Sequence, residues 1–300
     1  MELWIPITVA ATAAQTSRTA IQRHMKGPLG DYGASAIRFI YAVPFSWAWL
    51  LILFAFSNQN FPKPAIEFIF WATVGGIMQI LFTVLLIKLF SYKNFLVGVA
   101  FSKFEVLLAA IMEAVFLSAA ITAQFGIAIV LGIVAVFLLS LRNSTFSWQE
   151  LRLSLQSMST IIGLLAATAL ATSVISFRMA INSFDESDFL VRASVTAAIV
   201  IVGQALGLVG YLYFFRLSEL KAAFVLWRPG IAAGLFGSIA TITWFIAFAL
   251  HRAAPVRAIG QAELLFALVF TVLVFRQRIT KIELFGVLLL LGSIFLVIFS

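Results

Sequence analysis

The chain has 300 residues, of which 63% are hydrophobic and 11% are charged, and its mean hydropathy is +1.09. Soluble domains carry roughly 45–50% apolar and about 25% charged residues, so this composition excludes an ordinary soluble protein and indicates a polytopic membrane protein. The net charge of +8 is not gathered into a run of like charges, so nucleic acid is not an expected partner, and the lack of cysteine excludes disulfides and thiolate metal sites.

Ten apolar segments follow one another along the chain, each near the roughly 20 residues that a membrane-spanning helix needs. The first segment lacks the basic region that opens a signal peptide, so we expect it to remain as a span. Gly27, Pro28 and Gly30 predict the first turn. A short interfacial helix is expected over residues 216–227. We predict an all-α polytopic membrane protein with ten transmembrane helices, over residues 3–22, 33–56, 66–88, 94–117, 120–140, 156–178, 188–214, 229–250, 255–275 and 281–299.

One stretch occurs twice, which indicates an internal duplication. Residues 102–122 align with residues 260–280 without a gap, and the alignment brings Glu105 onto Glu263, because 263 − 105 = 158. Other blocks align in the same order at similar offsets. We therefore predict a first repeat over residues 1–142, a linker over 143–155 and a second repeat over 156–300, with five spans in each repeat.

Five is an odd number of spans, so the second repeat must enter the membrane from the side opposite to the first. Transporters built from such inverted-topology repeats place the substrate site near the midplane, between the halves, and work by alternating access. The arrangement predicts a secondary transporter.

The second copy of the repeated stretch also resembles a known family. Residues 262–292 read AELLFALVFTVLVFRQRITKIELFGVLLLLG, which is similar to the end of an EamA domain, where a Glu opens the ninth span, a turn follows and a Gly-containing tenth span comes after. Glu263 and Thr280 are separated by 17 residues (280 − 263), as are Glu105 and Thr122 (122 − 105). The resemblance implies a ten-helix member of the drug/metabolite transporter superfamily. Such proteins move small metabolites, amino acids or drugs, usually as exporters, and we expect this chain in the inner membrane.

Glu105 and Glu263 are the first candidates for a role in transport. A charged side chain at the bilayer centre costs about 2.5–3.5 kcal/mol even on the mildest scale, so a carboxylate found in both halves indicates function. Either residue could carry a proton or bind a substrate ammonium. The alternative is that each carboxylate only neutralises a buried base.

Two basic residues are the predicted partners of these carboxylates. Arg18 lies near the end of the first span, beside Gln15, and suits a carboxylate of the protein or of a substrate, or else it extends to the lipid headgroups. Lys103 stands two residues from Glu105, about 200° round a helix, so these two side chains cannot share a face. Lys103 therefore needs another partner or an aqueous cavity.

Polar residues at the midpoints of the third and eighth spans, Gln79, Thr241 and Trp244, are expected to line the same cavity. Thr241 has the alternative of hydrogen bonding within or between helices, and Trp244 the alternative of plain packing. Arg38 is interpreted as a structural anchor that pairs with Asp31.

The other function classes have weaker support in the sequence. The two histidines lie near predicted helix ends and no phosphate loop or nucleophile motif is visible, so we expect neither an enzyme nor a metal or other cofactor. A channel or a lipid flippase remains the alternative to a carrier. The expected partners are a small-molecule substrate, the lipid bilayer and protons, and the chain is expected as a monomer or a homodimer.

The orientation in the membrane is left open by the sequence. Most basic residues fall in loops after odd-numbered spans, which places these loops in the cytoplasm and both termini outside. Members of the resembled family have both termini inside.

Overall fold

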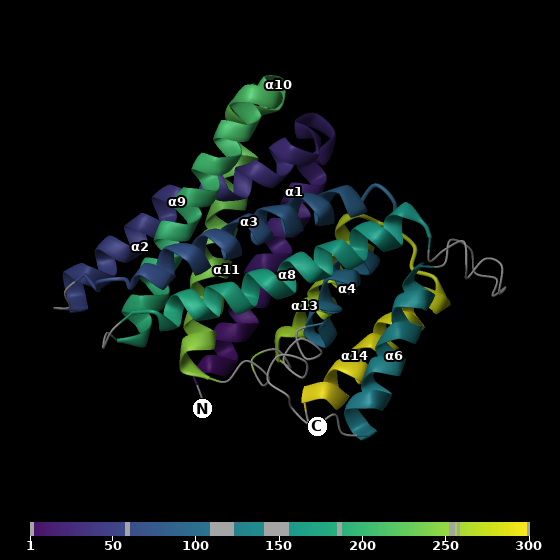
Figure 1. The fold of residues 1–300 in the computed structure, drawn as a ribbon. Helices are drawn as coiled ribbons and strands as arrows, with labels where there is room; N and C mark the ends of the chain where they lie inside the picture. The colour runs from purple at the N-terminus through teal and green to yellow at the C-terminus, as the bar shows by residue number, and fades with distance from the viewer. Residues whose placement is uncertain are drawn as a thin grey trace.

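The computed structural model describes residues 3–57, 61–108, 123–140, 156–184, 188–251, 256 and 259–298, and these residues are helical without a β-strand (Figure 1). The predicted linker at 143–155 and the end of the fourth predicted span lie outside the described residues. The elements are α1 (Trp4–Ile40), α2 (Ala42–Ser57), α3 (Ile66–Leu89), α4 (Phe95–Lys103), α6 (Ala123–Ser140), α8 (Met158–Asn182), α9 (Phe189–Phe215), α10 (Leu217–Val225), α11 (Trp227–Leu250), α13 (Ala262–Val269), the π-helical turn η1 (Phe270–Val274) and α14 (Lys281–Ile298).

The helices fit a membrane protein in length and composition. Among the described residues, five helical segments are long and apolar enough to cross a bilayer: Trp4–Phe56, Ile66–Leu89, Met158–Asn182, Phe189–Phe215 and Trp227–Leu250. Large apolar side chains such as Leu51, Phe214 and Leu273 face outward, as expected where lipid rather than water surrounds the helices. The short helix predicted over residues 216–227 is present as α10.

The first predicted turn is confirmed at Gly30 and wrong at Gly27 and Pro28. Gly27 and Pro28 lie inside α1, and the helix is interrupted only at Gly30, whose φ of 69° is open to glycine but costly for other residues. The backbone N–H of Gly33, at the start of the second part of α1, donates to the Oε2 of Glu219 on α10 over 2.8 Å. The first backbone N–H groups of a helix have no acceptor within that helix. The carboxylate of Glu219 supplies an acceptor for one of them, so the second part of α1 can begin directly after the kink.

The fourth and ninth predicted spans are also interrupted where the sequence predicts continuous helices. α4 ends at Lys103, and a single turn residue, Phe104, separates it from the helical residues 105–108. α13 begins after a turn at Gln261, so Glu263 lies in its first helical turn. Both carboxylates therefore stand just after a break and not at the middle of a helix.

Helices of the first half pack mainly against helices of the second half. α1 packs along α11, α3 along α8, and α6 along α14 (Figure 1). Smaller contacts join α2 to α9 and α4 to α13. The two predicted repeats thus share one interior and do not form two separate domains.

The two ends of this helical body can be told apart by their contacts. At the first end, α1 begins beside the end of α11, where the rings of Trp4 and His251 stack at 4.5 Å. α8 ends there too, since an apolar cluster contains Ile7 and Leu250 together with Ile181. The second end holds the kink of α1, the connection from α3 to α4, and the start of α14. Corresponding helices of the two halves, α1 and α8, therefore run in opposite directions.

We expect Gly234→Ala to loosen the contact between α1 and α11. A Cβ at Gly234 would lie 2.3 Å from the backbone carbonyl carbon of Tyr41, so α11 would have to move, at a cost of about 1–3 kcal/mol. Gly210→Ala in α9 is the matched control, because nothing lies within 4 Å of its Cβ position. Thermal unfolding in detergent should give a lower melting temperature for Gly234→Ala alone, and equal values for both variants would contradict this packing.

Candidate functional site

A cavity of about 70 Å³ lies between α1, α3, α4, α8 and α11. Its lining reaches Arg178 and Ile181 on α8 and Phe248 on α11, so it extends toward the first end. Small-molecule pockets usually hold roughly 300–1,000 Å³, so the walls would have to separate to admit a metabolite. Seven of the eight site residues predicted from sequence line the cavity: Gln15, Arg18, Gln79, Lys103, Glu105, Thr241 and Trp244.

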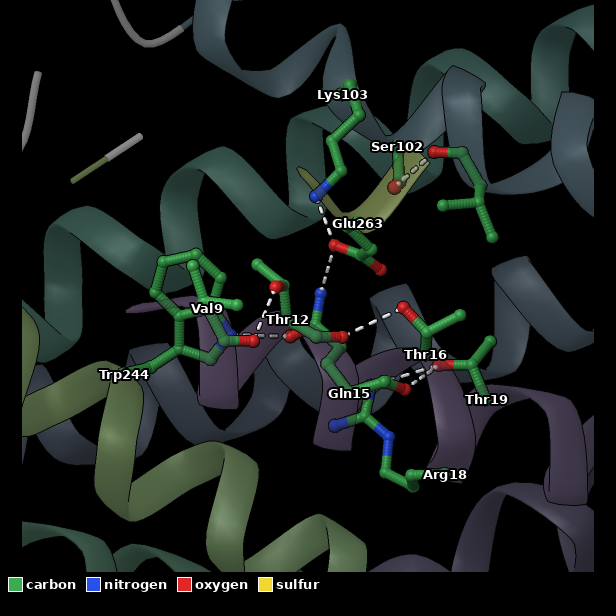
Figure 2. A network of polar contacts seen from close by, with 11 residues as sticks. Val9, Thr12, Gln15, Thr16, Arg18, Thr19, Ser102, Lys103, Trp244 and Glu263 are labelled. Atoms are coloured by element: carbon green, nitrogen blue, oxygen red, sulfur yellow. Dashed lines mark hydrogen bonds and ion pairs between the residues drawn. The ribbon is translucent and has the colours of Figure 1, made fainter. Parts of the chain in front are cut away.

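The eighth predicted residue, Glu263, belongs to a hydrogen-bonded network that joins four helices (Figure 2). Its Oε2 accepts from the Nζ of Lys103 in an ion pair and from the Nε2 of Gln15 over 2.6 Å. The Oε1 of Gln15 in turn accepts from the indole N–H of Trp244 over 3.0 Å. The network connects α4, α13, α1 and α11 in one line.

Both members of the ion pair are buried. The side chains of Lys103 and Glu263 are 5% and 3% exposed, so their charges are compensated by each other and not by water. The prediction that Lys103 needs a partner other than Glu105 is confirmed, and that partner comes from the opposite half. These contacts fit the neutralising role that the sequence left as an alternative for Glu263.

Glu105, the counterpart of Glu263 in the repeat, lies on the wall of the cavity itself. It is 5% exposed and follows the break at Phe104. The two carboxylates therefore differ in surroundings although they occupy equivalent positions: one lines the cavity and the other lies in the network behind Lys103 and Gln15.

Two arginines from α1 point to the same cavity. Arg18 donates from Nη2 to the Oγ1 of Thr19 over 3.3 Å, and Arg38 donates from Nη1 to the Oγ1 of Thr83 over 3.1 Å. The interpretation of Arg38 as an anchor for Asp31 is wrong. The kink at Gly30 brings Asp31 back to Lys26, at 2.8 Å, and leaves Arg38 directed into the interior.

The hydroxyl of Thr241 and the side chain of Gln79 make contacts with the protein itself. Thr241 donates to the carbonyl of Gly237, one turn earlier in α11, over 2.9 Å. The side-chain carbonyl of Gln79 accepts from the Nε2 of Gln204 on α9 over 2.8 Å. Thr241 thus has the helix hydrogen bond that the sequence left as its alternative, while Gln79 still presents part of its amide to the cavity.

Among the polar residues of the wall, sequence reasoning missed three: Arg38, Arg178 and Gln261. Gln261 could have been predicted as a wall residue, because the predicted repeat aligns it with Lys103 (261 − 103 = 158). Arg178 is exposed at the cavity mouth, near the end of α8. Within the described part of the chain, no group of three or more His, Asp or Glu side chains could hold a metal ion.

No protein-family model and no curated protein sequence matches this chain. A solved structure described as "Crystal structure of protein" is similar to it, with a TM-score of 0.60 and 15% sequence identity. The similarity covers 97% of this chain and 95% of the other. At this identity the comparison shows the fold alone, and it shows that fold over almost the full length of both chains.

We expect Glu263→Gln to destabilise the protein by about 3–5 kcal/mol, because it leaves the buried Lys103 charge uncompensated. The double variant Lys103→Met/Glu263→Gln should regain most of this loss, since it removes both charges. Melting temperatures in detergent, compared as a double-mutant cycle, measure the coupling.

The matched control for this cycle is Asp31→Asn. It breaks the more exposed pair with Lys26, which should be worth at most about 1 kcal/mol. If Glu263→Gln cost no more than Asp31→Asn, the buried pair would not be a stabilising contact.

Proposed function

We propose that this chain is a secondary transporter, with ten transmembrane helices in two inverted-topology repeats, that moves a small solute by alternating access. The observation that carries the proposal is a polar, charge-bearing cavity inside an apolar helical body, which extends toward the first end. Buried ionisable groups are costly in a membrane and mark the paths of substrates and coupling ions.

The packing of the helices supports the inverted repeat. Under the predicted repeat α1 corresponds to α8 and α3 to α11, so the contact of α1 with α11 becomes the contact of α8 with α3. These two helix contacts are the most extensive in the described structure, and the contact of α6 with α14 comes third. Under the predicted repeat, α6 and α14 are each other's counterparts. The opposite directions of α1 and α8 add to this support.

Membership of the EamA family is part of the proposal. The similarity to a solved structure shows one fold over 97% of the chain, and the family itself rests on the resemblance in sequence. An inner-membrane exporter is the function that the resemblance of residues 262–292 favours.

The second end of the molecule carries contacts that would close the cavity from that side. The guanidinium of Arg23 lies over three aromatic rings, at 5.3 Å from Phe90, 5.5 Å from Phe95 and 4.2 Å from Phe275. Asn94 donates from Nδ2 to the Oε1 of Glu283 on α14 over 2.9 Å. These contacts join α1 to the starts of α4 and α14, and their separation would expose the cavity to the second end.

A lipid flippase receives less support. A second hollow, of about 330 Å³, lies between α3 and α9 and is lined mainly by apolar residues such as Phe68 and Ile199, with Gln204 among the polar ones. None of the described residues that line it is basic, whereas a path for phospholipid headgroups would need positive charge. A channel would need a path open at both ends at once.

We expect single cysteines to report a cavity open to one side, since the natural chain has no cysteine. Val174→Cys on α8 lines the cavity and should react with a membrane-impermeant thiol reagent from one membrane face. Ala171→Cys is the control, because Ala171 on the same helix is 0% exposed. Adding Arg23→Ala should increase labelling of Val174→Cys from the opposite face. Equal labelling from both faces in the parent chain would contradict a cavity that is closed at the second end.

Transport itself is tested by counterflow in liposomes that contain the purified protein. Saturable exchange of labelled amino acids, amines or organic acids is the expected result. A current that rises linearly with solute concentration would favour a channel, and movement of labelled phospholipid between leaflets would favour a flippase.

A further inference from the structure

The charges around the cavity do not cancel. Four basic side chains and two acidic ones stand in its wall or directly behind it. Among the described residues their formal sum is 4 − 2 = +2. The basic residues are Arg18, Arg38, Lys103 and Arg178, and the acidic ones are Glu105 and Glu263.

Glu263 attracts Arg18 electrostatically, but its hydrogen-bonded partners are Lys103 and Gln15. Its Oε2 receives both Lys103 and Gln15, so the ion pair removes one charge of each sign. What remains around the cavity is three arginines and Glu105, or 3 − 1 = +2. The excess positive charge therefore lies with the guanidinium groups.

The two buried arginines have neutral partners. Arg18 and Arg38 are each 3% exposed, and within the described part of the chain neither has a carboxylate at ion-pair distance. Hydroxyl oxygens accept from them instead, and the Nε of Arg18 is buried without an acceptor among these residues. Buried cations without a counter-ion cost several kcal/mol each. An arrangement of this kind is stable when an anion enters it.

Both arginines line the same cavity. Their side chains pass Gly237 of α11, where a Cβ would lie 3.4 Å from the Cδ of Arg18 and 3.7 Å from the Cβ of Arg38. The two guanidinium groups are near enough to act on each other electrostatically. Two like charges on one cavity, neither with a carboxylate at ion-pair distance in the described residues, form a site for one anion, since planar guanidinium groups pair with carboxylates in bidentate fashion.

The rest of the wall is aromatic. The rings of Trp244 and Phe248 on α11 stack at 5.4 Å with an angle of 18° between their planes, and Phe177 and Phe245 also line the cavity. This surface offers contact to an apolar or aromatic body, next to the arginines that would hold a charged group.

From these observations we infer that the solute is a small organic anion, with its carboxylate held between Arg18 and Arg38 and its apolar part against Trp244 and Phe248. This inference rests on the proposed transport function and names the class of solute that the same cavity would take. Glu105, which adds negative charge to the wall, disfavours solutes with more than one negative charge.

The test uses three probes of similar shape: 3-phenylpropionate, the zwitterion phenylalanine and the cation 2-phenylethylamine. Binding is measured by thermal shift and by calorimetry on the purified full chain in detergent, and exchange is measured separately in liposomes. We expect 3-phenylpropionate to bind and to be exchanged in preference to the other two. Preference for the amine, binding of phenylalanine alone, or binding of none of the three would overturn the inference.

Variants separate a binding role from a structural one. Arg18→Gln and Arg38→Gln should each raise the Kd for 3-phenylpropionate roughly tenfold or more. Without ligand they should melt at the same or a higher temperature, because each removes an uncompensated charge. A drop in melting temperature with unchanged Kd would assign these arginines a structural role instead. Arg192→Gln is the control: Arg192 aligns with Arg38 under the predicted repeat (192 − 38 = 154) and does not line the cavity, so the Kd of this variant for 3-phenylpropionate should stay unchanged.

The two measurements keep this inference apart from the transport proposal. Binding of the anion without exchange in liposomes would retain the anion site and contradict the carrier. Exchange of the amine would retain the carrier and contradict the anion site.

Discussion

The structure depends on the ion pair between Lys103 and Glu263, two charges that an apolar interior tolerates only together. Their residues are 160 positions apart in the chain, so the pair forms only when α4 of the first half meets α13 of the second. The helix dipoles also help to stabilise the two buried charges. Lys103 lies in the last turn of α4 and Glu263 in the first turn of α13, where the helix dipoles favour a cation and an anion respectively. The breaks at these positions are therefore part of what allows charge in this interior.

Gln15 extends the same constraint to two further helices. Its amide has two polar ends, and the structure uses both: the N–H₂ group donates to Glu263 and the carbonyl accepts from Trp244. The position of Trp244 on the cavity wall is thereby coupled to the ion pair. A movement of α11 relative to α13 would have to lengthen one of these hydrogen bonds, so the network ties the shape of the cavity to the contact between the halves.

The sequence allowed the membrane class, most helix positions and seven of the cavity residues to be predicted, because apolar length and isolated polar residues are local signals. It did not allow the partner of Lys103 to be named. Helical spacing excluded Glu105, but the choice of Glu263 depends on how α4 packs against α13. Nor did it reveal the break at Phe104, where neither Gly nor Pro interrupts the apolar pattern. The place of Arg38 was missed because a turn over Gly27, Pro28 and Gly30 was expected to separate two spans, whereas the chain is redirected at Gly30 alone and stays helical on both sides.

Under the proposed repeat, the two halves agree in their helix packing but differ in the chemistry of the wall. Lys103 corresponds to Gln261, and Arg18 to Val174 (174 − 18 = 156), so basic residues of the first half face neutral residues of the second at equivalent positions. Helix packing does not require this difference, because the equivalent contacts of α1 with α11 and of α8 with α3 are both extensive. In the described residues the positive charge of the cavity thus comes mainly from one half. Under the proposed repeat, the helix packing follows the symmetry, whereas the charges of the cavity wall depart from it.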